Sequence, residues 1–134
     1  MLKITAPLAS LTGGDPVVAD VTEGLPAVST STAPVYSAPI DLPAGEYAFE
    51  VRVTSTGLSS TGESFTIRLV NPAGAEVMGY IVPAHSSWPP AQAVVFHPTI
   101  TAPGAYRISM QTSSASSTSG VGHIDRIRVI RVAT

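Results

Sequence analysis

Hydrophobic and polar residues alternate along several stretches of this chain, most regularly in "EYAFEVRV" at 46–53. Because successive side chains of a strand point to opposite faces of a sheet, this stretch predicts a strand with one buried face and one wet face. "SFTIRLV" at 64–70 and "YRISMQ" at 106–111 repeat the pattern. "AEVMGYIV" at 75–82 is apolar on both faces, which indicates a more covered strand or a subunit contact. In 46–53 the predicted buried face holds Tyr47, Phe49, Val51 and Val53, and the wet face holds Glu46, Ala48, Glu50 and Arg52.

Proline and glycine separate these stretches. "LPAGEY" at 42–47 and "TAPGAY" at 101–106 follow nearly the same plan, and "NPAG" stands at 71–74. Proline presets φ at a turn entrance and glycine permits a positive φ, so each phrase predicts a tight turn. We therefore expect hairpins that join 35–42 to 46–53, 67–70 to 75–80, and 93–100 to 106–112.

The chain contains about seven such strands between residues 35 and 132. Further strands are expected in "LKITA" at 2–6 and "PVVADV" at 16–21. In the last strand, "HIDRIRVIRV" at 123–132, Ile127 and Val129 share one parity while Ile130 and Val132 share the other, which predicts a bulge or a change of covered face. The predicted fold class is all-β, an antiparallel β-sandwich of the jelly-roll type.

Residues 1–34 differ in composition from the rest of the chain. They are poor in bulky residues and rich in Pro, Ser and Thr around "GLPAVSTSTAP". Such a composition favours extended chain. We therefore expect an extended N-terminal arm at 1–34, with room for a first strand, and a β-sandwich domain at 35–134. Thr5 and Pro7 interrupt the apolar start, which makes it a poor signal peptide, so no secretion signal is expected.

Charge and composition exclude several classes of partner. Only 12% of residues are charged and the net charge is −2. Nucleic acid is not expected because no basic face is clustered, and a membrane span is not expected because no run of about 18 apolar residues is present. The chain has no Cys, so it forms no disulfide or thiolate metal site. Arg126 and Arg128 alternate along the last strand, and we expect them to pair with Glu on adjacent strands or to lie at an interface.

Motifs that carry chemistry are absent from the sequence. There is no G-x-S-x-G elbow, no Gly-rich phosphate loop and no H-E-x-x-H. The three His residues match no zinc spacing, and the carboxylates Asp41, Glu46 and Asp125 are not concentrated in one loop as calcium would require. We therefore expect no enzyme activity, no cofactor and no metal.

"LPAGEYAFEVRV" and the closing "HIDRIRVIRV", with Ile124 and Asp125 at matching places, resemble phrases in the jelly-roll sandwiches of carbohydrate-binding modules. The Pro, Gly, Tyr, Phe phrase also resembles the trimeric jelly rolls of the C1q and tumour-necrosis-factor type. Short jelly-roll proteins that decorate the heads of tailed bacteriophages or form their fibres are similar too. The resemblance covers residues 35–132, and it implies a sandwich that binds glycans in the first case or assembles as a trimer in the others.

Trp88, the only Trp, stands in the Pro-bounded loop "PAHSSWPPAQ" with His85 nearby. A loop Trp can stack on a sugar ring, with Tyr80 or Tyr36 as a second platform. Alternatively, Trp88 caps the sandwich or fills a subunit interface. Met78, Tyr80 and Val82 form an apolar strand face that we expect to contact other copies of the chain.

Two hypotheses follow for the function. The main one is a non-enzymatic structural protein located in a virion, a bacteriophage capsid decoration or a head or tail fibre protein. It would form a homotrimer and stabilise the neighbouring major capsid subunits, with the arm ordered on contact. This hypothesis accounts for the low charge and the Pro-rich arm. The alternative is a carbohydrate-binding module that uses Trp88 to bind glycans.

Overall fold

The structure, a computed structural model, describes residues 17–28, 33–56, 64–83, 91–112 and 121–133. These residues form strands and connecting segments, and none of them belongs to a helix that could cross a membrane. The strands are β1 (Val17–Val21), β2 (Ala27–Val28), β3 (Val35–Tyr36), β4 (Ile40–Leu42), β5 (Gly45–Thr56), β6 (Ser64–Val70), β7 (Glu76–Pro83), β8 (Ala91–Phe96), β9 (Thr99–Ile100), β10 (Gly104–Thr112) and β11 (Val121–Ala133).

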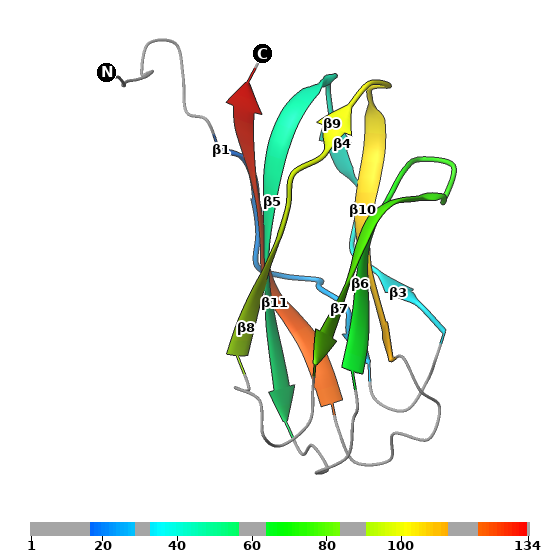
Figure 1. Ribbon diagram of the computed structural model, residues 1–134, viewed down its shortest axis with the longest axis vertical. Helices are drawn as coiled ribbons and strands as arrows, with labels where there is room; N and C mark the ends of the chain where they lie inside the picture. Colours follow the sequence, from blue (N-terminus) through cyan, green and yellow to red (C-terminus); the bar gives the residue numbers. More distant parts are fainter. Residues whose placement is uncertain (1–16, 29–32, 57–63, 84–90, 113–120, 134) are drawn as a thin grey trace.

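The strands form two antiparallel sheets that face each other (Figure 1). The six-stranded sheet has the order β1-β11-β5-β8, with β2 also on β11 and β9 also on β5. The five-stranded sheet has the order β3-β10-β6-β7, with β4 also on β10. The pairs are nested, because the first strands pair with the last and the innermost pair is β6 with β7. A chain paired in this way is one long hairpin rolled into a sandwich, so the predicted jelly-roll fold is confirmed.

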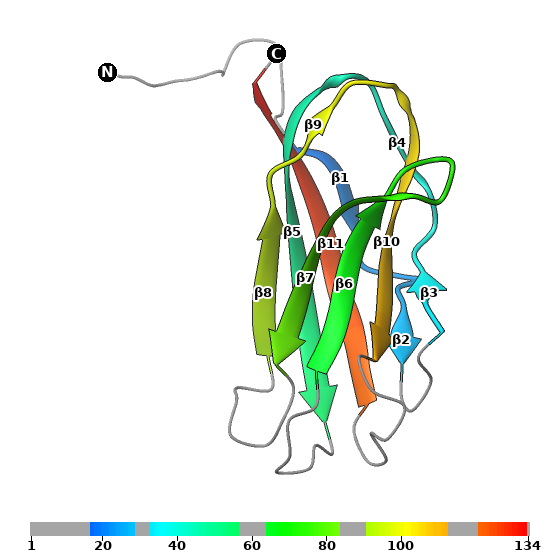
Figure 2. The ribbon, with the colours of Figure 1, turned by 45° about the vertical axis from the view of Figure 1, so that its right-hand side comes forward.

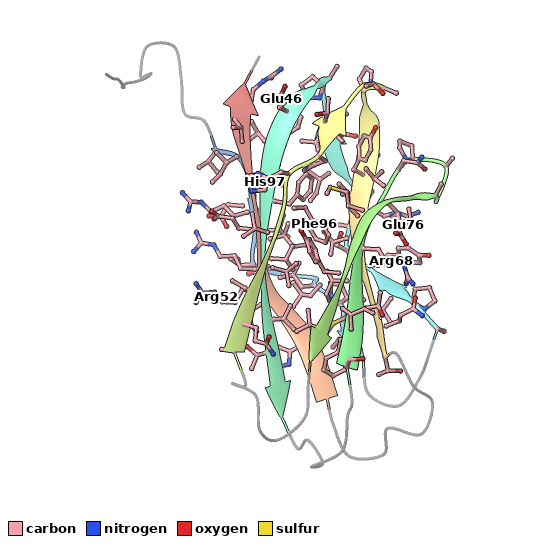
Figure 3. The ribbon with its side chains drawn as sticks, viewed as in Figure 1. Glu46, Arg52, Arg68, Glu76, Phe96 and His97 are labelled. Atoms are coloured by element: carbon pink, nitrogen blue, oxygen red, sulfur yellow. The ribbon has the colours of Figure 1, made fainter. Side chains whose placement is uncertain are left out.

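The core between the sheets is built from the inward-facing residues of each strand. Tyr47, Phe49, Val51 and Val53 of β5 are at most 1% exposed, as the alternation predicts. Phe96 of β8 is fully buried and lies between the two sheets (Figure 3). Burial of each such side chain contributes roughly 1.5–3 kcal/mol. The five-stranded sheet contributes Phe65, Ile67 and Leu69 from β6, and Tyr106, Ile108 and Met110 from β10.

The phrase that recurs at 42–47 and 101–106 forms two arches between the sheets. The hydroxyl of Tyr47 donates to the carbonyl of Pro43 at 2.7 Å, and that of Tyr106 donates to the carbonyl of Ala102 at 2.6 Å, each four residues earlier. Both rings are buried in the core, so each hydrogen bond ties an arch to the core. The arrangement is a tyrosine corner of the kind found in other β-sandwiches. Both arches lie at the same end of the sandwich (Figure 2).

Two of the three predicted hairpins are therefore wrong. β4 pairs with β10 and β9 pairs with β5, so the chain changes sheet at both turns. The strands that flank one arch pair with the strands that flank the other. Leu42 pairs with Gly104, and Gly45 pairs with Ile100. The physical reason is the buried tyrosine, whose ring occupies the space between two sheets that pack roughly 10 Å apart. A tight turn would have kept both flanking strands in one sheet.

The third predicted hairpin, β6 to β7, is confirmed. Asn71 closes its turn, because its side-chain Oδ1 accepts hydrogen bonds from the amides of Ala73 at 3.0 Å and Ala75 at 2.9 Å. Gly74 has a φ of 86°, a conformation that glycine adopts without steric cost. The local turn chemistry thus decides this connection.

β1 and β2 lie within 1–34, the stretch assigned to the arm. Both pair with β11, and Ala19, Val21 and Leu25 pack against the core. The sandwich therefore includes residues before 35, because β1 and β2 extend the sheet beyond β11 and bring apolar side chains against the core. Residues 1–16, including the predicted strand at 2–6, lie outside the described residues.

The last strand is bulged, but not between Val129 and Ile130, where the parity change predicted an irregularity, because there its pairing with β5 continues without a shift. The pairing of β11 with β5 shifts between Ile124 and Arg126. This shift leaves Ile124, Ile127 and Val129 inside, and it places Arg126 and Arg128 on the outer face of the sheet.

We expect Tyr47→Phe and Tyr106→Phe each to lower the free energy of unfolding by about 1–2 kcal/mol, because each leaves an arch carbonyl without its donor. Tyr80→Phe, at a ring that is 48% exposed, is the matched control and should change it by less than about 0.5 kcal/mol. Urea unfolding measures all three. Equal effects in the three variants would show that the hydroxyls do not hold the arches.

Candidate functional site

A shallow hollow lies on the outer face of the six-stranded sheet. It has a volume of about 260 Å³, close to the lower end of the usual range for ligand sites. Alternation on β5 and β8 and the bulge in β11 direct the lining side chains away from the core. They are Glu50 and Arg52 from β5, Ala93 and Val95 from β8, and Arg126 and Arg128 from β11, with Val51 beneath.

A second hollow of about 240 Å³ adjoins the first along β8, where Ala91 and Gln92 add to its lining. Arg52 and Ala93 line both hollows, so together they form one depression, which we call the sheet groove. Between Val95 and Ala91 the groove is roughly 13 Å long, at roughly 3.3 Å per strand residue. On β8, the edge strand, Ala91 and Ala93 have small side chains, and this leaves the floor of the groove recessed. Arg52 points away from the core into solvent (Figure 3).

Two of the three groove arginines are paired with carboxylates. Arg126 donates from Nε to Oδ1 of Asp20 at 2.8 Å and from Nη2 to Oδ2 at 2.6 Å. Arg128 donates from Nη1 to Oε1 of Glu50 at 3.4 Å. These hydrogen bonds from Arg126 lower the pKa of Asp20, and those to Asp20 raise the pKa of Arg126. The predicted pairing with acidic residues of adjacent strands is confirmed, although Arg126 pairs with an Asp of β1 rather than with a Glu.

Arg52 has no carboxylate partner in the described part of the chain. It lies on β5 directly opposite Arg126 of β11 on one side and Ala93 of β8 on the other. Like charges directly opposite each other destabilise a sheet. The groove therefore presents one guanidinium whose donors are not taken up by an acidic side chain.

One end of the groove carries a separate polar cluster. The hydroxyl of Thr54 donates to Oδ2 of Asp125, and Nε2 of His123 lies 3.1 Å from Oδ1 of the same carboxylate. Asp125 is thus engaged by Thr54 and His123 rather than by Arg52. Within the described ranges, no three His, Asp or Glu side chains gather so that they could hold a metal ion.

The outer face of the five-stranded sheet has its arginines engaged. Arg68 donates from Nε to Glu76 at 2.7 Å and from Nη1 to Gln111 at 2.5 Å, and Figure 3 shows Arg68 and Glu76 together on this side. The guanidinium of Arg107 lies 4.8 Å from the centre of the Tyr36 ring. Arg107 is thus covered by an aromatic ring, whereas no ring contact is found for Arg52 within the described residues.

Three of the five residues that the sequence singled out, Met78, Tyr80 and Val82, lie on β7 in the described part of the chain. Trp88 and His85 lie outside the described residues. Val82 is only 2% exposed and Met78 packs against the core, so these two side chains face inward. The contact with other copies stays a prediction. Tyr80 is 48% exposed, and its ring covers Phe96 with the centroids 5.2 Å apart. Ile81, which is 68% exposed, is more exposed than Val77 and Tyr80, the other exposed large hydrophobic residues of β7.

Sequence reasoning did not identify the sheet groove. It placed Glu50 and Arg52 on a wet strand face and Arg126 and Arg128 on another, which is correct. The sequence did not show that these two strand faces lie side by side, because it does not show that β5 lies between β11 and β8. The alternation of "AQAVVF", with Ala91, Ala93 and Val95 on one parity, was the available signal for a low floor.

No family model and no curated protein matches this sequence. Solved structures do resemble the fold. The carbohydrate-binding module TmCBM61, in complex with β-1,4-galactotriose, has a TM-score of 0.52 at 15% identity and covers 85% of this chain and 86% of its own. CBM6cm-2, the module from Cellvibrio mixtus lichenase 5A in complex with cellotriose, has a TM-score of 0.50 at 15% identity. This match covers 87% of our chain and 98% of the module.

The insecticidal delta-endotoxin Cry8Ea1 from Bacillus thuringiensis has a TM-score of 0.55 at 21% identity. The match covers 81% of this chain but only 19% of the toxin chain. At these identities the likenesses show the fold, a β-sandwich shared with carbohydrate-binding modules. The comparisons do not support the phage-decoration and C1q-like parts of the resemblance, the trimer or the capsid partner. Location in a virion stays a prediction.

Arg126→Gln should return the pKa of Asp20 toward its ordinary value of 3.8, because hydrogen bonding from Arg126 is the main cause that lowers it. A carboxyl whose folded pKa is depressed stabilises the fold above its unfolded pKa and loses that contribution as the pH falls through the folded pKa. In the native chain the docking of β1 on β11 should therefore weaken as the pH falls through the folded pKa of Asp20, and in Arg126→Gln this pH dependence should be reduced.

Carboxyl ¹³C NMR titration measures the pKa of Asp20. Arg128→Gln is the control and should shift it less, since Arg128 makes the smaller contribution. An Asp20 titration that is the same in Arg126→Gln and the native chain would contradict the pairing.

Proposed function

We propose that this protein is a non-catalytic carbohydrate-binding module and that its ligand lies in the sheet groove. The observation that carries the proposal is the groove itself, a depression with a floor of small apolar side chains and a wall of planar hydrogen-bonding groups. Sites for small ligands combine these two features.

The groups of the groove match the two kinds of surface that a sugar presents. Guanidinium N–H groups donate to hydroxyl oxygens, and the carboxylate of Glu50 accepts from hydroxyl protons. Ala93 and Val95 offer an apolar floor to the C–H face of a ring. Because the hydrogen bond between Arg128 and Glu50 is long, at 3.4 Å, both side chains keep capacity for a ligand.

The groove is preorganised by the fold. Its side chains project from β5, β8 and β11, and β5 pairs with both of the other strands. Sites on strands hold their geometry better than sites on loops. The likeness in fold to modules solved with galactotriose and cellotriose supports the proposal. A contribution from Trp88 stays a prediction.

We expect Ala93→Leu to weaken oligosaccharide binding at least about tenfold, a change of about 1.4 kcal/mol, because the larger side chain fills the floor of the groove. Ala75→Leu adds the same side chain at an exposed turn of the other sheet and should leave the Kd unchanged. Isothermal titration against a panel of soluble oligosaccharides, neutral and acidic, measures both.

Thermal unfolding of the two variants confirms that both are folded. If no oligosaccharide of the panel binds the native chain, the proposed function fails. If Ala93→Leu and Ala75→Leu bind a sugar equally well, the ligand lies elsewhere on the protein.

A further inference from the structure

We infer that the sheet groove selects acidic sugars, and that Arg52 binds the carboxylate of a uronic acid residue. This inference rests on the proposed function, since it names the class of sugar that the same groove would take. It comes from the charges of the groove. Binding neutral hydroxyl groups does not require as many arginines as line it.

The lining of the first hollow holds three arginines and one carboxylate. Asp20 lies beside it and engages Arg126, and Glu50 engages Arg128. Asp125, at the end of the groove, is held by Thr54 and His123. Each nearby described carboxylate thus has a partner of its own, and the charge of Arg52 is left over in a chain whose net charge is −2.

The position of this charge favours an anion. Arg52 and Arg126 are directly opposite on neighbouring strands, a placement that costs stability when nothing lies between them. A carboxylate between them would remove this cost and could accept two parallel hydrogen bonds from a guanidinium fork. Asp20 occupies Nε and Nη2 of Arg126, so Nη1 of that residue lies outside the pair.

The surroundings favour a sugar acid over a large polyanion. The three groove arginines form a small cluster in a protein whose net charge is −2, which is far from the extended basic face that nucleic acids require. Ala91 and Ala93 beside Arg52 leave a low apolar floor on which a ring can lie. A uronic acid presents both the ring and the carboxylate.

The test uses two sugars that differ only at C6. Cellotriose is neutral, and β-1,4-linked triglucuronate is its carboxylated analogue. We expect the native chain to bind triglucuronate about tenfold or more tightly than cellotriose, with the difference reduced at high salt. Arg52→Gln should remove the difference, and Arg52→Lys, which keeps the charge but not the fork, should keep part of it. Arg107→Gln, on the other sheet, is the control and should change neither Kd.

The outcomes separate the inference from the proposed function. Equal affinity for the two sugars, or an unchanged preference in Arg52→Gln, overturns the acidic selectivity and leaves a neutral-sugar module. Binding of neither overturns both the inference and the function, if the wider panel also fails to bind. A triglutamate peptide that binds as tightly as triglucuronate and with the same dependence on Arg52 shows a general carboxylate site and overturns the selectivity for sugars.

Discussion

Two hydrogen bonds from buried tyrosines to arch carbonyls fix the way in which this chain passes between its sheets. The hydroxyls of Tyr47 and Tyr106 hold the crossings from β4 to β5 and from β9 to β10. Because each crossing delivers a strand to the sheet that the other crossing leaves, β9 pairs with β5 and β4 with β10. The order of both sheets, and with it the position of β5 between β11 and β8, depends on these two corners.

The site follows from that order. Once β5 is central, its outward residues meet those of β11 and β8 in rows, so Arg52 lies between Arg126 and Ala93. The bulge in β11 then decides that Arg126 and Arg128 face outward rather than into the core. Surface ion pairs contribute little to stability, so the fold itself does not require the three arginines of the groove. The ligand that we propose gives them a role.

The sequence predicts the local features well and the long-range ones poorly. Alternation identified the buried faces of β5, β6 and β10, because it is a local property. The parity change in the last strand predicted an irregularity at the wrong position, since the bulge beside Arg126 depends on the pairing with β5. The repeated phrase was interpreted as a tight turn, since Pro and Gly alone do not show that a tyrosine will fill the space behind them. The groove could not be predicted, because Arg52, Ala93 and Arg126 are distant in sequence and only the strand order joins them.

The central claim is that the outer face of the six-stranded sheet is the binding surface. Amide chemical-shift mapping during a titration with triglucuronate tests it most directly, because each strand reports separately. The account predicts that the largest shifts fall on β5, β8 and β11, around Arg52, Ala93 and Arg126, with β6, β7 and β10 little changed. Shifts concentrated on the five-stranded sheet, or no shifts at saturating ligand, would contradict it.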